Sequence, residues 1–149
     1  MAKKVLLIDD DKNAVKYLSV VLEENGYETY AAYDGREGLQ KIQELNPDLI
    51  VLDVMMPKKS GFTLFKQLRR DEQYKNLPVL MLTGVAGVLE ELDEESADTS
   101  ARPFDSLREA LRRTIREMRS EGLIKPEMFM DKPIDSAAFL ARIQAMIGG

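Results

Sequence analysis

The chain has 149 residues, of which 44% are hydrophobic and 32% are charged, with a formal net charge of −5 at pH 7. This is the size and composition of one globular domain, and it argues against a disordered chain. Cysteine and histidine are both absent, which excludes disulfides, thiolate metal sites and the commonest general base. The acidic balance, without a basic tract, also argues against a nucleic-acid partner within this chain.

Membrane and export signals are missing from the sequence as well. No apolar run approaches the roughly 20 residues needed to span a bilayer. The start, MAKKVLLIDD, has an apolar stretch too short for a signal peptide, and this stretch ends in acids. We therefore expect a cytoplasmic protein with no membrane partner.

Short apolar runs alternate with helical patterns along the chain. The apolar runs predict strands at residues 4–9, 27–33, 48–53, 77–83 and 127–132. Apolar residues at helical spacing predict helices at 14–22, 35–45, 61–68 and 136–147. Asp34 and Asp135 stand where the second and last of these helices begin, and Asn46-Pro47 ends the second. Strands that alternate with helices predict an α/β fold, an open parallel sheet with helices on both faces.

The span between the fourth and fifth strands breaks this alternation. It runs from residue 84 to residue 126, about twice the length that a single crossover helix requires. Its first part is acidic, and residues 105–121 predict an arginine-rich helix with Ser106 and Glu109 as a capping box and Gly122 as a stop. The arginines could bind an anion or a partner. The acids among them make a solvated helix face the simpler interpretation.

Polar side chains stand at the ends of four of the expected strands. Asp9 and Asp10 end the first, Asp53 the third, Thr83 the fourth and Lys132 the fifth. The carboxyl ends of parallel strands share one edge, where α/β sheets bind ligands. Carboxylates brought together there would repel one another unless a cation lies among them. Mg²⁺ binds carboxylate and phosphate oxygens together, so the pattern predicts a magnesium-dependent phosphate site with one carboxylate available as a nucleophile.

The stretches that carry these residues resemble the receiver domain of bacterial two-component response regulators. They are LLIDDD, DLIVLDVMMPKKSG, PVLMLTG and FMDKPID, and the similarity covers roughly residues 3–84 and 126–147. Asp53 followed by Pro57 and Gly61, together with Lys132-Pro133, is a specific signature of that family. The resemblance implies a flavodoxin-like (CheY-like) doubly wound sheet of five parallel strands in the order 2-1-3-4-5. In this chain the fourth crossover would be enlarged.

The resemblance also implies a role for each matched site residue. Asp53 would be the phosphoacceptor. Asp10, Asp53 and the backbone carbonyl of Met55 would bind Mg²⁺, with Asp9 acting largely through water. Lys132 would pair with the phosphoryl oxygens.

Two further positions would form a conformational switch. The phosphoryl group adds negative charge and acceptor oxygens, which favours a state in which Thr83 and Lys132 contact them. Phe129 would turn inward behind Thr83, although its position also suits an ordinary core aromatic. Asp11 is expected to cap the first helix, and Tyr27, Tyr30 and Tyr33 to pack along the second strand.

These implications describe a single receiver domain over residues 1–149, with an insertion at about 85–125. Since the chain has no histidine, phosphate would come from a separate sensor histidine kinase or histidine phosphotransfer protein. The receiver would catalyse only its own phosphorylation and dephosphorylation, and it would signal by binding an unknown downstream protein. No effector domain follows the last helix, which fits either a single-domain regulator or a fragment of a longer protein.

Two other functions fit parts of the pattern. Haloacid dehalogenase-like phosphatases also use an aspartyl phosphate and Mg²⁺, but their motif calls for Thr or Val where this chain has Asn13. A phosphorylation-independent interaction module of the same fold would not need the complete set of polar strand ends.

Overall fold

A computed structural model describes residues 2–53, 61–83, 113, 116–117, 120–122, 128–131 and 134–148. Its strands are β1 (Lys4–Ile8), β2 (Glu28–Ala32), β3 (Leu49–Asp53), β4 (Val79–Thr83) and β5 (Phe129–Asp131). Its helices are α1 (Lys12–Glu23), α2 (Gly35–Leu45), α3 (Gly61–Arg69) and α6 (Ser136–Ile147).

The five strands form one sheet in the order β2-β1-β3-β4-β5, and every pairing is parallel. Leu7 in β1 pairs with Ala31 in β2 and with Val51 in β3, while Thr83 at the end of β4 pairs with Asp131. This topology confirms the predicted α/β fold and the strand order implied by the resemblance.

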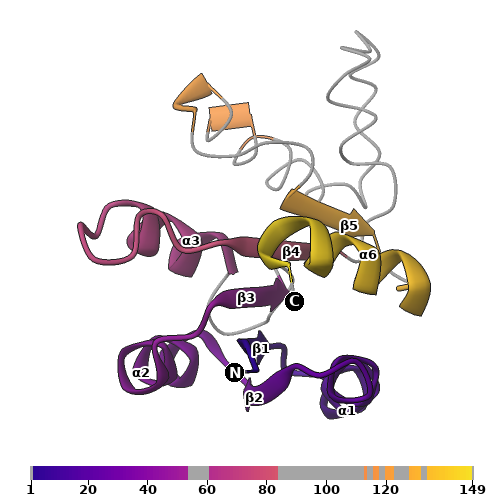
Figure 1. Cartoon of the computed structure of the whole chain (residues 1–149). Helices are drawn as coiled ribbons and strands as arrows, with labels where there is room; N and C mark the ends of the chain where they lie inside the picture. The colour runs from indigo at the N-terminus through magenta and orange to yellow at the C-terminus, as the bar shows by residue number, and fades with distance from the viewer. Residues whose placement is uncertain are drawn as a thin grey trace, which may run out of the picture.

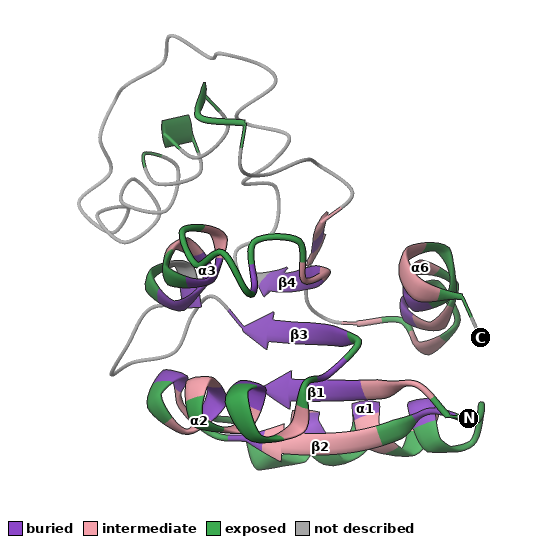
Figure 2. Cartoon of the chain, turned by 60° about the vertical axis from the view of Figure 1, so that its left-hand side comes forward, coloured by how far each residue is buried: buried purple, intermediate pink, exposed green. Residues whose placement is uncertain are grey.

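Helices cover both faces of the sheet, with α2 and α3 on one side and α1 and α6 on the other (Figure 1). Each face has its own apolar core, because alternate residues of a strand point to opposite faces. Leu6, Ile8, Ile50 and Leu52 join the core under α2 and α3, and the intervening Val5, Leu7 and Val51 join the core under α1 and α6. The inner strands are therefore buried along most of their length, whereas the edge strand β2 is only partly covered (Figure 2).

Aspartates cap three of the helices. Side-chain oxygens of Asp11, Asp34 and Asp135 accept hydrogen bonds from backbone amides in the first turns of α1, α2 and α6. These bonds satisfy amides that have no partner within the helix. The capping predictions for these residues are confirmed. Asn46, which follows the last residue of α2, caps its carboxyl end in a left-handed conformation with φ of 48°.

Tyr30 lies in β2 and packs against the core beneath α2 and α3, as predicted, but Tyr27 and Tyr33 lie outside the strand. The strand begins only at Glu28, and the Tyr27 hydroxyl donates a hydrogen bond of 2.8 Å to the carbonyl of Gly148. Tyr33 follows the strand and is 38% exposed. Its ring lies beneath the Lys12 ammonium, 5.5 Å from the ring centroid, so the expectation that it packs along the strand was wrong.

The long span after β4 lies largely outside the described residues, including Ser106 and Glu109 of the expected capping box. Residues 113, 116–117 and 120 are helical, as predicted for that stretch. Gly122 has a φ of 73°, the conformation typical of the residue that ends a helix. Within the described parts of the chain, no helix is both long and apolar enough to cross a bilayer.

Candidate metal centre

Three aspartates meet at the carboxyl edge of the sheet. Asp9 and Asp10 follow the last residue of β1, and Asp53 is the last residue of β3. β1 and β3 are neighbours whose register pairs Ile8 with Leu52, so the next residue of each strand reaches the same point of the edge. One carboxylate oxygen from each of the three aspartates lies within 4.8 Å of the others.

The burial of these carboxylates is unequal. Asp9 and Asp53 are each only 3% exposed, whereas Asp10 is exposed. Two acids are thus fixed in the floor of the cluster and the third stands at its open side. An ion could approach from solvent and contact all three.

Backbone hydrogen bonds position Asp9. Its amide donates to the carbonyl of Ala32 at 3.0 Å, which continues the β1–β2 pairing by one residue. Its side-chain Oδ1 accepts from the amide of Asp11 at 2.9 Å, an Asx turn that fixes the carboxylate. Asp11 in turn uses its own Oδ1 to cap α1, accepting from the amides of Asn13 and Ala14 at 3.0 and 3.3 Å. The turn therefore holds Asp9 inward and separates Asp11 from the cluster.

The donor set fits a hard divalent cation. All three ligands are carboxylate oxygens, which Mg²⁺ and Ca²⁺ prefer, and none is the sulfur or imidazole that zinc and copper favour. Lys12, which follows Asp11 in the sequence, lies over the Tyr33 ring and makes no ion pair within the described residues. Like charges at this spacing repel, and a bound cation would offset that repulsion. The cluster is compatible with Mg²⁺.

Comparison with known families agrees with this geometry. The model of the family described as "Response regulator receiver domain" matches residues 5–116. The chain belongs to this family. As a receiver domain it is a component of two-component signal transduction.

Curated relatives support the assignment. The chain is 40% identical over 122 residues to the DNA-binding dual master transcriptional regulator RpaA of Synechocystis sp., a match that covers 76% of this chain and 51% of the relative. It is 48% identical over 83 residues to the alkaline phosphatase synthesis transcriptional regulatory protein PhoP of Bacillus subtilis, covering 56% of this chain and 34% of the relative. The chain therefore spans about half, or less, of these relatives.

Solved structures share the whole fold. The chemotaxis protein CheY4 of Vibrio cholerae superimposes with a TM-score of 0.71 at 29% identity, covering 98% of this chain and 99% of CheY4. A putative response regulator from Chloroflexus aurantiacus gives a TM-score of 0.71 at 25% identity, with both chains covered completely. These matches confirm the CheY-like fold.

The structure of this receiver brings together the three carboxylates that the sequence singled out. Thr83 ends β4, beside β3, and its backbone therefore lies at the same sheet edge as Asp53. Met55 and Lys132 lie outside the described residues, so their assigned roles stay predictions.

Phe129 is the first residue of β5, pairs in register with Met81 and is 4% exposed. It belongs to the core beneath α2 and α3. This placement fits an ordinary core aromatic, and the switch role given to Phe129 remains a prediction.

Two contacts at this edge were not foreseen from the sequence. One is the Asx turn between Asp9 and Asp11, which the acidic run DDD could have suggested because Asp often accepts from the amide two residues on. The other is the Lys12–Tyr33 contact, which joins residues after two different strands. No local pattern signals such a contact, because it depends on how β1 and β2 pair.

Proposed function

We propose that Asp53 of this receiver accepts a phosphoryl group from a phosphohistidine on a separate protein, and that the phosphorylated state binds a downstream partner differently. The observation that carries the proposal is the approach of three carboxylates to within 4.8 Å at the ligand-binding edge of a doubly wound sheet. The donor would be a sensor histidine kinase or a histidine phosphotransfer protein. The phosphoryl donor and the downstream partner are both proposed on the strength of family membership. We also propose that the protein is cytoplasmic.

In the transfer, a carboxylate oxygen of Asp53 attacks phosphorus. The new O–P bond forms as the P–N bond to imidazole breaks, and the leaving nitrogen keeps the bonding pair until the ring takes up a proton. Asp53 suits the nucleophilic role because β3 pairs with a strand on each side, so its last residue is held in place. Its 3% exposure limits the access of competing water.

The remaining roles follow the family. Asp10 and Asp53 would hold Mg²⁺ with the Met55 carbonyl, and Asp9 would act largely through water. Mg²⁺, when bound, supplies positive charge that offsets the charge of the phosphoryl oxygens. Lys132 would pair with those oxygens and Thr83 would donate its hydroxyl to them. On this proposal the chain catalyses only its own phosphorylation and dephosphorylation.

The test uses acetyl phosphate as a small phosphoryl donor. The chain is incubated with acetyl phosphate and Mg²⁺, and intact mass spectrometry should show the addition of one phosphoryl group. Peptide mapping should place it on residue 53. EDTA should prevent the addition, and so should Asp53→Asn.

Asp48→Asn is the matched control. Asp48 precedes β3 at the opposite end from Asp53, and its carboxylate accepts a hydrogen bond of 2.7 Å from the amide of Lys4. This variant should be phosphorylated as fully as the unmodified chain. An adduct that persists in Asp53→Asn, or none at all on the unmodified chain, would refute the proposal.

A further inference from the structure

A cavity of about 530 Å³ lies at the amino-terminal edge of the sheet. Its lining includes Val79, the first residue of β4, Met128, which precedes β5, and Met146 near the end of α6. The carboxylates of the metal centre lie at the opposite edge, separated from the cavity by the length of β4, about 13 Å at the usual rise of a strand. The cavity is therefore a separate site.

One side of the cavity is cationic. Arg69, Lys75 and Asn76, from the end of α3 and the loop after it, line this side. The ammonium of Lys75 already pairs with the carboxylate of Glu72 at 3.1 Å. Arg69 is the other cationic residue among the described residues that line the cavity.

Arg69 is partly buried and held in one orientation. Its guanidinium lies over the Phe65 ring, 4.7 Å from the centroid, and Nη1 donates a hydrogen bond of 2.8 Å to the carbonyl of Leu77. Within the described residues no carboxylate pairs with it. A guanidinium has five N–H donors, and among the described residues only the Leu77 carbonyl accepts from Arg69. Partial burial also lowers the pKa of Arg69.

The other side of the cavity is apolar. Val79 is buried, and Met128 and Met146 are partly covered. Methionine side chains are flexible and polarisable, and they adapt to apolar groups of irregular shape. The volume of the cavity falls within the range of pockets that hold small organic ligands, about 300–1,000 Å³.

We propose that this cavity binds a small monocarboxylate with an apolar body, its carboxylate on Arg69 and its body against the partly accessible Met128 and Met146. One guanidinium that has no acidic partner among the described residues matches one negative charge, and the planar fork of arginine matches a carboxylate. A dianion would leave a second charge against the apolar side. The site lies apart from Asp53, so the proposal does not depend on phosphorylation.

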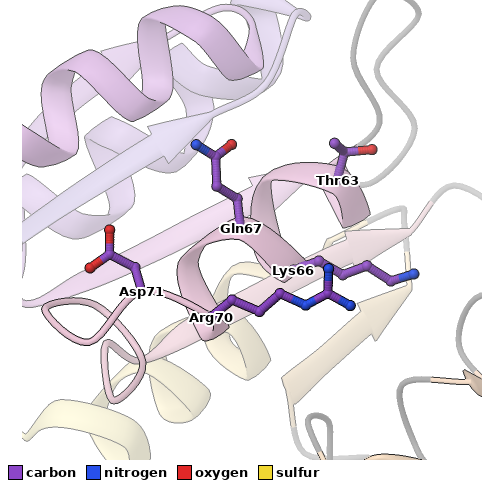
Figure 3. Close-up of a pocket in the computed structure, with 5 residues that line it drawn as sticks. All are labelled: Thr63, Lys66, Gln67, Arg70 and Asp71. Carbon is purple, nitrogen blue, oxygen red and sulfur yellow. The ribbon is translucent and has the colours of Figure 1, made fainter.

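A second pocket offers a contrast and a control. It has a volume of about 500 Å³ and lies along the outer face of α3, where Thr63, Lys66, Gln67, Arg70 and Asp71 line it (Figure 3). All of these described lining residues are polar, and Lys66 also pairs with Glu117 at 3.8 Å. Arg70, next to Arg69 in the sequence, faces this polar pocket instead of the apolar one. Removing its charge should not affect the proposed site.

The probe is decanoate, compared with its neutral analogue decan-1-ol. Binding to the whole chain is followed by calorimetry and by amide chemical shifts in NMR. We expect decanoate to bind with a dissociation constant of about 1 mM or lower and to shift the amides of Lys75, Asn76 and Val79. Decan-1-ol should bind about tenfold more weakly, because it offers no charge to Arg69.

Two pairs of variants test the residues. Arg69→Met should weaken decanoate binding about tenfold and leave decan-1-ol binding unchanged, whereas Arg70→Met should bind both as the unmodified chain does. Met146→Glu places a carboxylate in the cavity and should abolish decanoate binding, whereas Thr63→Glu in the polar pocket should not affect it. The second pair keeps the test decisive if Arg69→Met fails to fold.

Three results would overturn the proposal. These are no decanoate binding at concentrations up to about 10 mM, equal affinity for decanoate and decan-1-ol, and equal loss of binding in Arg69→Met and Arg70→Met. Phosphorylation of Asp53 in Arg69→Met should match that of the unmodified chain. This measurement separates a failure of the cavity proposal from a failure of the proposed function.

Discussion

The amide of Asp11 donates a hydrogen bond of 2.9 Å to Oδ1 of Asp9, while the side chain of Asp11 caps α1. Three consecutive acids thus have three different environments. Asp9 is buried and held by a backbone amide, Asp10 is exposed within the carboxylate cluster, and Asp11 belongs to the helix. Because these environments differ, substitutions of single aspartates should give different and separable results.

We expect Asp10→Asn to raise the free energy of unfolding in EDTA by roughly 1 kcal/mol, because it removes one of three like charges at close range. The same change removes a metal ligand, so the additional stability conferred by Mg²⁺ should shrink. Urea unfolding with EDTA and with Mg²⁺ measures both effects. Ligand-linked stability rises with the logarithm of metal concentration, so the comparison should use a Mg²⁺ series.

Asp11→Asn is the control for this experiment. It also removes one negative charge from the acidic run, but asparagine caps helices as well as aspartate does. The stability gained from Mg²⁺ should therefore match that of the unmodified chain. If Asp10→Asn and Asp11→Asn respond alike to Mg²⁺, Asp10 is not a ligand.

Asp11→Ala should reduce the free energy of unfolding by about 1 kcal/mol, because the amides of Asn13 and Ala14 lose their acceptor. Asp11→Asn should change it by only a few tenths of a kcal/mol. Urea unfolding in EDTA is the measurement. Equal stability of the alanine and asparagine variants would show that the cap contributes nothing.

The part of the fold that could be predicted depends on local patterns and on one rule of sheet geometry. Apolar runs such as KVLLI mark inner strands, and the aspartates before α1, α2 and α6 mark helix starts. The proximity of Asp9, Asp10 and Asp53 could be predicted from the sequence because the carboxyl ends of parallel strands lie at one edge of the sheet. Strand order itself came from the family resemblance, since alternation of strands and helices fixes no order.

The rest depends on contacts between distant parts of the chain. Tyr27 contacts Gly148 and Arg69 contacts Leu77 through backbone carbonyls, which are acceptors in every residue and leave no mark on the sequence. Tyr33 looked like a strand residue because it continues the pattern of Tyr27 and Tyr30, but β2 ends before it at Ala32. A cavity lined by separate elements is also invisible until those elements are placed.

Gly38→Ala should destabilise the chain by about 1–3 kcal/mol, the usual cost of overpacking. A Cβ at this position would lie 2.7 Å from Cδ1 of Ile8 and 3.2 Å from its Cγ1 and Cγ2, where α2 packs closely on β1. In an Ile8→Val background Cδ1 is gone, so the cost of Gly38→Ala should fall. Urea unfolding of Gly38→Ala, Ile8→Val and the double variant measures the coupling free energy between positions 38 and 8.

Gly26→Ala serves as the comparison for that cycle. A Cβ there meets no atom within 4 Å, but the residue has a φ of 89°. Its cost should be about 1–2 kcal/mol of backbone strain and should be the same with Ile8 or Val at position 8. A coupling for Gly26→Ala as large as that for Gly38→Ala would show that the effect is not steric contact with Ile8.

Tyr27→Phe should lower the free energy of unfolding by about 1 kcal/mol near neutral pH, because the phenol loses its hydrogen bond to Gly148. This difference in free energy of unfolding between Tyr27→Phe and the unmodified chain should become smaller in alkali. Burial raises the pKa of Tyr27 above its ordinary value of 10.0, so folding favours the protonated phenol. That contribution is fully present below pH 10 and is lost as the pH rises through the folded-state pKa.

Unfolding of Tyr27→Phe and of the unmodified chain should therefore be compared from pH 7 to about pH 11. The difference in free energy of unfolding between the two chains should narrow above about pH 10. Above this pH the Tyr27 phenol ionises more readily in the unfolded state than in the folded state, which destabilises the unmodified chain, whereas phenylalanine has no proton to lose. Tyr17→Phe, at a position 47% exposed on α1, should change stability at pH 7 by no more than about 0.5 kcal/mol. A gap for Tyr27→Phe that stays constant to pH 11 would mean that the Tyr27 phenol ionises as easily in the folded chain as in the unfolded one.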